Sequence, residues 1–315
     1  MDENSMTVNL DWFRDDGIFL PMLNDTGRNV FYKSAIEQHV AGRTVVDIGA
    51  GTGLLSVLAV KAGASHVWAV EQDANRAQLA QDFISKIGLS SVIEVVHADF
   101  LDTNLPADYY VSETINTQIF GENILQLAEH ARKHNGIFIP GQFKVWVEIY
   151  DNHPIFPLCQ ARSDAYEFQP DIDIDPEFEK KLKNTFDQSN SLNNTLYRAN
   201  ILNGLFHELH KFTDLKLTRL RKFNPITVDL NQLVDINNIK FEFDPADIWP
   251  SGDDIFNNDP YMVLCWKAVS GPAEMHSADT WFGNVAKILR RSHRTANAPV
   301  KIWYDHSITD WRLSY

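Results

Sequence analysis

Cysteine is almost absent from this chain: Cys159 and Cys265 are the only two among 315 residues. Two cysteines cannot form the disulfide framework that holds small secreted proteins together, so we expect a protein of the reducing cytoplasm. Long apolar runs are also missing, since none approaches the roughly 18 residues that a membrane-spanning helix needs. Residues 1–5 are acidic and polar, unlike a secretory signal. The sequence therefore predicts a cytoplasmic protein without a membrane partner.

Positive charge is scarce as well. Lys and Arg together number 28 against 42 Asp and Glu, which gives a formal net charge of −14. This excess of negative charge argues against binding to the phosphate backbone of a nucleic acid. It is compatible with a basic substrate, such as an arginine compound or an arginine-rich peptide, which the field of the protein would attract. Plain solubility explains the charge equally well, so charge alone does not choose the substrate.

Metal-ligand spacing is the third absence. His276, His293 and His306 have no cysteine or acidic partners at the intervals that a metal site requires, so we predict no metal. Internal repeats and low-complexity segments are also missing. These absences leave an ordinary globular enzyme or binding protein as the expectation.

The chain is organised around residues 44–71. Residues 44–48 are apolar and rich in β-branched side chains, which predicts a short buried parallel strand. Gly49, Gly51 and Gly53 follow, where the backbone can turn tightly and approach a ligand closely. A helix-period apolar run comes next, and a second strand, residues 66–70, ends on Glu71. A strand–turn–helix–strand unit with an acid at the tip of its second strand is typical of a nucleoside-binding site. The acid accepts hydrogen bonds from the ribose hydroxyls.

The glycine pattern indicates which nucleoside is bound. Dinucleotide sites use G-x-G-x-x-G, because a pyrophosphate needs the bare amides of a helix N-terminus. Here the glycines follow G-x-G-x-G after Asp47, an acid that repels a pyrophosphate but suits an ammonium or sulfonium group. The whole pattern, with the later Val70-Glu71, resembles the class I methyltransferase fingerprint, which implies S-adenosyl-L-methionine as the cofactor. A dinucleotide site or a merely structural turn remains the alternative on the glycines alone.

The remaining pattern predicts three regions. Residues 1–40 form an N-terminal helical segment covering the cofactor site, with a helix at 29–40. Residues 41–140 alternate strand and helix patterns, which predicts an α/β domain of Rossmann-like type with a parallel sheet. From residue 141 to 315, alternating strands without regular helices predict an antiparallel β-barrel domain for the substrate, with an insertion near 164–203. We interpret Trp146, Trp266 and Trp303, which lie in alternating runs, as core of that domain.

Two glutamates, Glu113 and Glu122, stand nine positions apart after the predicted strand 109–113. The carboxyl end of such a strand is the ligand-binding edge of an open α/β sheet. Two carboxylates that converge there can hold the planar fork of a guanidinium. The alternative is structural: Glu113 ends a strand, and Glu122 is a first-turn acid favoured by the dipole of the next helix.

A family resemblance favours the interpretation that Glu113 and Glu122 bind a guanidinium. The S-E-x(8)-E spacing resembles the double-glutamate loop of the protein arginine N-methyltransferases. Residues 22–29 are similar to that family's M-L-x-D-x-x-R segment, and 138–151 resemble its crossing into a β-barrel. Residues 279–281 resemble a variant of its T-H-W loop. The matched blocks occur in the family's order, whereas residues 152–238 are largely unmatched.

The resemblance implies a role for each matched residue. Arg28 would bind the methionine carboxylate of the cofactor, Glu71 its ribose, and Asp99 would lie near the adenine. Glu113 and Glu122 would be the catalytic pair that binds and orients the guanidinium. The remaining implied site residues shape the cofactor pocket or contact the substrate: Asp47, Gly49 and Gly51 for the cofactor, and Phe13, Thr280 and Trp281 for the substrate.

The substrate side departs from the family pattern more than the cofactor side. Thr280 replaces the usual histidine. Ile115 and Asn116 replace the usual residues inside the loop between Glu113 and Glu122, which we call the acidic loop. The N-terminal segment carries Trp12 and Phe13 in place of tyrosines. The methyl donor is therefore better indicated than the acceptor.

The resemblance implies an S-adenosylmethionine-dependent N-methyltransferase that acts on peptidyl arginine or on free L-arginine. Similarity to one subclass implies that it stops at monomethylarginine. A biosynthetic enzyme acting on free arginine and an inactive cofactor-binding regulatory partner are the alternatives, and a dinucleotide oxidoreductase is a weaker one. A homodimer is a further expectation, with residues 164–203 as a candidate arm.

Overall fold

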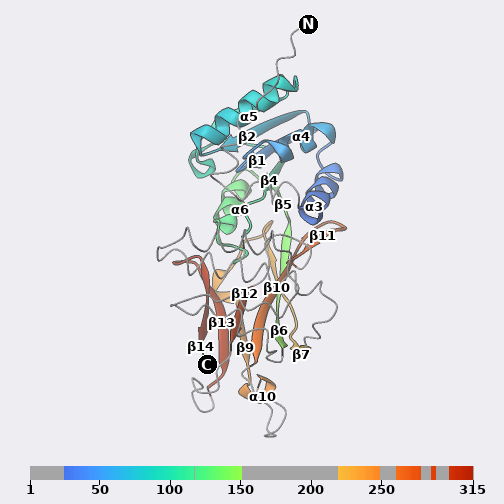
Figure 1. The fold of residues 1–315 in the computed structure, drawn as a ribbon. Helices are drawn as coiled ribbons and strands as arrows, with labels where there is room; N and C mark the ends of the chain where they lie inside the picture. The colour runs from blue at the N-terminus through green and yellow to red at the C-terminus, as the bar shows by residue number, and fades with distance from the viewer. Residues whose placement is uncertain are drawn as a thin grey trace, which may run out of the picture.

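The computed structural model describes residues 25–116, 118–150, 219–248, 260–277, 285–288 and 298–314, and the account below concerns these residues. Figure 1 shows an α/β part that carries helices α3 to α6 and a second part built of antiparallel strands. Among the described residues, no helix is long and apolar enough to cross a membrane.

The α/β part contains a parallel sheet in the order β3-β2-β1-β4-β5. Because the chain proceeds from β1 outward to β3 and then returns to β4, the direction of winding reverses between β1 and β4. Ligands of open α/β sheets bind outside the carboxyl ends of the strands at such a switch point. The strands are β1 (Thr44–Ile48), β2 (His66–Glu71), β3 (Ile93–His97), β4 (Tyr109–Ser112) and β5 (Ile137–Ile139).

Aspartate side chains cap two of the helices of this part. Asp25 caps α3 by accepting a hydrogen bond from the Arg28 amide at 2.9 Å, and Asp73 caps α5 through the Arg76 amide at the same distance. Each cap satisfies an amide that the first helical turn leaves unbonded. The helices are α3 (Thr26–Glu37), α4 (Leu54–Lys61), α5 (Ala74–Lys86) and α6 (Ile124–Arg132), with a 3₁₀ turn η1 (Phe100–Asp102).

The second part consists of two antiparallel sheets, which together make the barrel-like fold expected from the alternating runs. One sheet has the order β11-β10-β6-β7, with β12 also pairing β10 and β8 also pairing β6; the other has the order β14-β13-β9. The first is built from β6 (Gln142–Tyr150), β7 (Arg219–Lys222), β8 (Ile226–Asp229), β10 (Tyr261–Ser270), β11 (Ala273–His276) and β12 (Val285–Ile288). The second is built from β9 (Lys240–Phe243), β13 (Val300–Asp305) and β14 (Asp310–Ser314), with η2 (Ile236–Asn238) and α10 (Pro245–Ile248) near β9.

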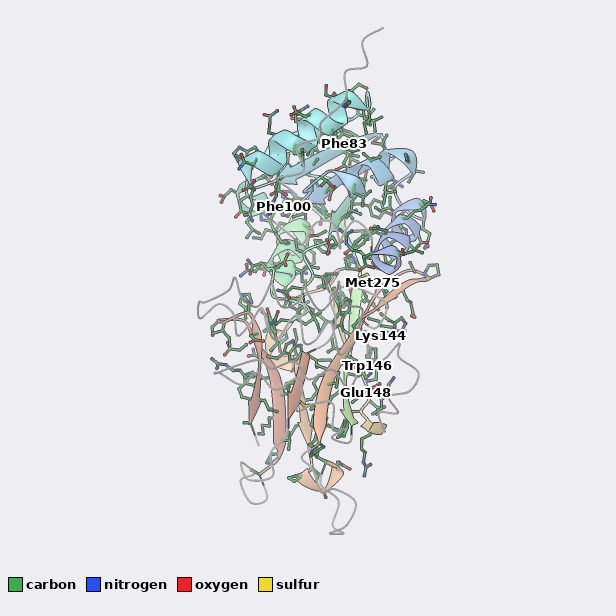
Figure 2. All side chains as sticks on the ribbon, viewed as in Figure 1. Phe83, Phe100, Lys144, Trp146, Glu148 and Met275 are labelled. Carbon is green, nitrogen blue, oxygen red and sulfur yellow. The ribbon has the colours of Figure 1, made fainter. Side chains whose placement is uncertain are left out.

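Strand β6 shows why the alternation predicts a sheet with one buried face. Its odd-numbered side chains, Phe143, Val145, Val147 and Ile149, are completely buried. Its even-numbered side chains Lys144, Trp146 and Glu148 lie in a row along the same strand (Figure 2), and the Trp146 indole donates to Glu148 at 2.8 Å. The period of two residues therefore assigns the two faces of the sheet.

The tryptophan prediction is confirmed for one residue of three. Trp266 is completely buried, at 0% exposure. Trp146 is half-buried on the outer face of β6, and Trp303 is 36% exposed, so neither is core. The prediction is wrong for Trp303 because its neighbours Ile302 and Tyr304 occupy the inward positions of β13.

The first helix begins earlier and ends earlier than predicted. Helix α3 spans Thr26–Glu37, whereas the apolar spacing predicted 29–40, because the cap at Asp25 starts the helix directly. The predicted region boundaries at residues 40 and 140 stay predictions, and the predicted insertion at 164–203 lies outside the described residues.

Candidate active site

The glycine turn lies at the carboxyl end of β1, as predicted. Gly49, Gly51 and Gly53 have φ values of +70°, +55° and +82°, a region that side chains with a Cβ rarely adopt. Gly49 is exposed, and a Cβ there would contact the Thr114 side chain at 3.4 Å. The turn therefore presents backbone rather than side chain on the ligand-binding edge of the sheet.

Glu71 holds this turn from the tip of β2. Its Oε2 accepts from the Gly51 amide and its Oε1 from the Asp73 amide, both at 2.9 Å. The side chain is only 4% exposed. Each carboxylate oxygen retains capacity for a second donor, so Glu71 can shape the turn and still accept hydroxyl groups of a ligand.

Asp47 is the buried acid beneath the turn. It is 1% exposed, and the Ser56 hydroxyl donates to its Oδ2 at 2.6 Å. Burial raises the pKa of Asp47 to about 6, because the charged form loses water, although the hydrogen bonds from Ser56 act in the opposite direction. A cation bound above the turn would favour the ionised form.

Glu113 and Arg28 meet at the switch point. Arg28 Nη2 lies 2.6 Å from Glu113 Oε2, and both side chains are 5% exposed. The other carboxylate oxygen, Glu113 Oε1, is buried and has no hydrogen-bond partner among the described residues. Arg28 therefore lies in the interior of the protein, at 4% exposure.

Burial dominates the electrostatics of Glu113. It raises the pKa of this carboxyl to about 7, although the charge and hydrogen bond of Arg28 act to lower it, and nearby Glu122 raises it further. Tyr32 closes the same site: its hydroxyl donates to the Ser112 carbonyl at 2.8 Å, and burial raises its pKa well above the usual value. Tyr32 thus remains a protonated donor that fixes the end of β4.

Glu122 follows a tightly wound loop and precedes α6. It lies outside that helix, whose N-cap is Asn123, so it is not a first-turn acid. Partial loss of water around the carboxyl raises the pKa of Glu122, and the Arg76 charge opposes this effect. Because Glu122 is exposed, water screens both effects.

Of the remaining predicted site residues, the structure describes Asp99 alone. Asp99 lies after β3, is exposed, and caps η1 by accepting from the Leu101 amide at 2.9 Å. That contact fits a structural loop residue, and its adenine role stays a prediction. Phe13, Thr280 and Trp281 lie outside the described residues.

Sequence reasoning missed several residues that hold the acidic loop. Asn116 Oδ1 accepts from the amides of Gln118 and Gly121, at 3.0 and 3.2 Å. Tyr304 and Trp311, from the far end of the chain, donate to carbonyls of the same loop. The Asn–x–x–x–x–Gly spacing could have predicted the contact between Asn116 and Gly121. By contrast, no sequence pattern pairs residues that lie about 190 positions apart.

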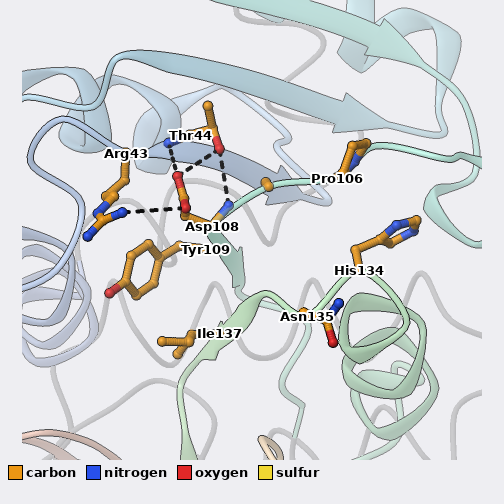
Figure 3. A pocket seen from close by; sticks show the side chains of 9 residues that line it. Arg43, Thr44, Pro106, Asp108, Tyr109, His134, Asn135 and Ile137 are labelled. Atoms are coloured by element: carbon orange, nitrogen blue, oxygen red, sulfur yellow. Dashed lines mark hydrogen bonds and ion pairs between the residues drawn. The ribbon is translucent and has the colours of Figure 1, made fainter.

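A cavity of about 450 Å³ lies elsewhere, at the amino ends of β1, β4 and β5 (Figure 3). Its lining includes Arg43, Asp108, Tyr109 and His134, and Asp108 accepts from both the amide and the hydroxyl of Thr44. This is the edge of the sheet opposite the switch point, and its charged groups already bond to one another. We therefore place the candidate active site at the carboxyl edge of the sheet, where Glu71, Arg28 and Glu113 lie.

Comparison with known proteins finds similarity to methyltransferases. The family model described as "Ribosomal protein L11 methyltransferase (PrmA)" matches residues 33–140. The arginine N(omega)-methyltransferase of Streptomyces achromogenes subsp. streptozoticus is 35% identical over 151 residues, which cover 44% of this chain and 42% of that protein. Mouse protein arginine N-methyltransferase 9 is 40% identical over 121 residues, 36% of this chain and 14% of that protein. The matches thus span less than half the length of these relatives.

Solved structures extend the likeness to almost the whole chain. The crystal structure of PRMT6-SAH aligns with a TM-score of 0.58 at 17% identity, covering 97% of this chain and 99% of that one. The Trypanosoma brucei PRMT1 enzyme-prozyme heterotetrameric complex with AdoHcy aligns with the same score over 91% and 86%. The fold is that of the protein arginine methyltransferases. Within this fold, the range matched by the family model, residues 33–140, includes the glycine turn.

Proposed function

We propose that this protein transfers a methyl group from S-adenosylmethionine to a guanidino nitrogen of arginine. The observation that carries the proposal is the carboxylate of Glu113, with one oxygen held by Arg28 and the other, Oε1, buried and unbonded among the described residues. Such an oxygen needs an N–H donor, and a guanidinium offers several in one plane. Glu122, on the exposed side of the same loop, is the second carboxylate of the pair.

The residues at the ends of β1 and β2 fit the proposed cofactor. Glu71 offers carboxylate oxygens to ribose hydroxyls, Asp47 offers an acid to the ammonium group, and Gly49 leaves the backbone exposed. When bound, S-adenosylmethionine supplies a methyl group on a positively charged sulfur. We propose that Arg28 binds its carboxylate while keeping Glu113 in place, with Gly51 in the pocket and Asp99 on the adenine side.

The chain's own groups act by orientation and proton handling. A guanidinium keeps its proton up to a pKa above ~12 and is therefore a poor nucleophile. Two carboxylates that localise its charge on one nitrogen leave another nitrogen better able to attack, and alignment with the donor supplies the larger effect. The raised pKa of Glu113, about 7, also suits it to accept a proton near neutral pH.

Two acceptors follow from the relatives. Most carry names of protein arginine methyltransferases, whereas the Streptomyces relative is named for arginine itself. We propose peptidyl arginine as the principal acceptor and free L-arginine as the second candidate, with monomethylarginine as the product. Phe13, Thr280 and Trp281 remain proposed substrate contacts. A homodimer and a cytoplasmic location are part of the same proposal, the latter because the chain has only two cysteines.

A methyl-transfer assay with labelled S-adenosylmethionine tests the proposal. Free L-arginine and an arginine-rich peptide are offered in parallel, and mass spectrometry counts the methyl groups added. Label on the peptide supports protein modification, and label on the free amino acid makes this a biosynthetic enzyme. Bound cofactor without label on either acceptor would contradict the proposed activity and favour a regulatory partner.

The Glu122→Gln variant provides the first mutational test. It removes the charge of one carboxylate and keeps its shape, so we expect transfer to fall at least 100-fold, about 2.7 kcal/mol of transition-state stabilisation. Cofactor affinity, measured by calorimetry, should stay within twofold. Glu129→Gln is the matched control, because Glu129 is exposed on α6. Wild-type rates in Glu122→Gln would rule out its role.

A further inference from the structure

The loop between Glu113 and Glu122 contains a strained turn. Ile119 has a φ of +71°, although it is a β-branched residue that avoids this region. The Phe120 amide donates to the Gln118 carbonyl at 2.9 Å, so a γ-turn closes around Ile119. A conformation of this kind persists only where the surrounding structure holds it.

The hairpin β13–β14 holds this turn from the opposite end of the chain. The Tyr304 hydroxyl donates to the Phe120 carbonyl at 2.9 Å, and the Trp311 indole donates to the Gln118 carbonyl at 3.0 Å. Burial, with Asp310 and Asp305 adding to its effect, raises the pKa of Tyr304 to about 12, so the hydroxyl keeps the proton it donates. The carbonyls on either side of Ile119, those of Gln118 and Phe120, are thus bonded to one hairpin.

Packing and a third contact support the same hairpin. The Phe120 side chain is completely buried, and its ring meets those of Tyr304 and Trp311 at centroid distances of 5.3 and 6.4 Å. At the turn of the hairpin, His306 Nε2 lies 2.9 Å from Gln126 Nε2 on α6. The hairpin therefore contacts the chain on both sides of Glu122, at residues 118 and 120 before it and 126 after it.

We propose that the β13–β14 hairpin is a clamp that fixes the acidic loop and thereby sets the position of Glu122 toward the acceptor. Tyr304 and Trp311 are positioning residues for methyl transfer, acting through the loop backbone rather than on the substrate. The proposal rests on the proposed role of Glu122. It adds that the geometry of the acceptor site is controlled by the last strands of the chain.

Three variants test the clamp. Tyr304→Phe and Trp311→Phe each remove one donor and keep an aromatic ring against Phe120. Tyr110→Phe is the matched control, because the Tyr110 hydroxyl is also bonded to a backbone carbonyl, Leu105 O at 2.7 Å, at the amino end of β4. All three changes remove one hydrogen-bond donor and keep an aromatic ring, although the ring of Trp311→Phe is smaller, and only two of them act on the acidic loop.

The first measurement needs no activity. Amide hydrogen exchange followed by mass spectrometry reports the opening of residues 116–123. We expect exchange there to be about tenfold faster in Tyr304→Phe and Trp311→Phe, because each removes a hydrogen bond from the hairpin to a carbonyl of the loop, and unchanged in Tyr110→Phe. Equal protection of the loop in all variants would overturn the clamp.

The second measurement is the rate of transfer. We expect kcat to fall about tenfold in Tyr304→Phe, with the KM for S-adenosylmethionine within twofold of wild type. In the Glu122→Gln background, the same change should cause no further loss, because the group being positioned is already disabled. An additional tenfold loss in that background would show that Tyr304 acts independently of Glu122 and would overturn the proposal. If wild type transfers nothing to arginine, the proposed function fails, and hydrogen exchange still decides whether the hairpin clamps the loop.

Discussion

Glu113 is the residue whose surroundings are least ordinary. It is a carboxyl group in the interior, paired with Arg28 on one oxygen and unbonded on the other among the described residues. A buried ion pair offsets only part of the cost of removing two charges from water, which explains why burial outweighs Arg28 and raises the pKa of Glu113 to about 7. Such an arrangement adds little to stability, which fits the catalytic role proposed for Glu113.

The raised pKa of Glu113 predicts how stability depends on pH. Because the pKa in the folded protein, about 7, exceeds the ordinary value of 4.5, the folded state binds the proton more tightly than the unfolded chain. Its contribution to stability is therefore complete below pH 4.5 and is lost as the pH rises through 7, by at most about 3 kcal/mol. Chemical denaturation at pH 5 and pH 7.5 measures the difference.

The Glu113→Gln variant isolates this contribution. The fall in the free energy of unfolding between the two pH values should be smaller in Glu113→Gln than in wild type, because Asp47 titrates in both proteins. Glu129→Gln should retain the wild-type fall. An identical fall in Glu113→Gln would mean that Glu113 stays ionised throughout this range.

The acidic loop is the element that organises the acceptor side. Its shape depends on Asn116, whose Oδ1 accepts from two loop amides, and on Gly121, where a Cβ would lie 2.2 Å from the Asn116 side-chain nitrogen. No side chain fits at residue 121 without displacing that amide group. The loop is therefore specified by a short-range pair before the hairpin clamps it.

Gly121→Ala and Asn116→Ala should therefore have similar consequences. The first displaces the Asn116 amide and the second removes it, so each leaves the amides of Gln118 and Gly121 without their acceptor. We expect transfer to fall about tenfold or more and the free energy of unfolding to fall by about 1–3 kcal/mol in both. Cofactor affinity should remain unchanged, because the glycine turn after β1 is not touched. A large loss in one variant and none in the other would contradict the shared mechanism.

The elements themselves differ in how far the sequence predicts them. The strand ending at Glu71 has the predicted bounds, because an apolar run between the turn at Gly63 and the helix cap at Asp73 leaves few alternatives. Strand β5 was not predicted, since a run of three residues carries little periodicity, and the five-residue hairpin strand β14 was not predicted either. The Arg28–Glu113 pair joins residues 85 positions apart. Periodicity places Arg28 near the start of a helix and Glu113 just after a strand. It cannot show that these two side chains, one proposed for the cofactor and one for the substrate, bond to each other.

At the scale of the whole molecule, the parallel sheet and the antiparallel sheets are connected by specific polar contacts. Asn231, which follows β8, brackets Phe138 of β5: its Oδ1 accepts from the Phe138 amide at 2.7 Å and its Nδ2 donates to the Phe138 carbonyl at 3.2 Å. Nearby, Arg132 Nη1 donates to the Leu230 carbonyl at 2.9 Å. Because the acidic loop belongs to one part and its clamp to the other, the active site requires both parts in a fixed relation.

Asn231→Ala should weaken that relation. The change removes two hydrogen bonds between the parts, so we expect the free energy of unfolding to fall by about 1–3 kcal/mol and the single calorimetric transition expected for wild type to separate into two. Asn237→Ala is the control, because within the described part of the chain the Asn237 side chain bonds only locally, to Asp235 at 3.1 Å. Transfer should fall in Asn231→Ala while cofactor binding persists, since the glycine turn lies within the parallel-sheet part. If scanning calorimetry shows one transition at the wild-type temperature, the two parts are held together by their apolar contacts, and Asn231 contributes only locally.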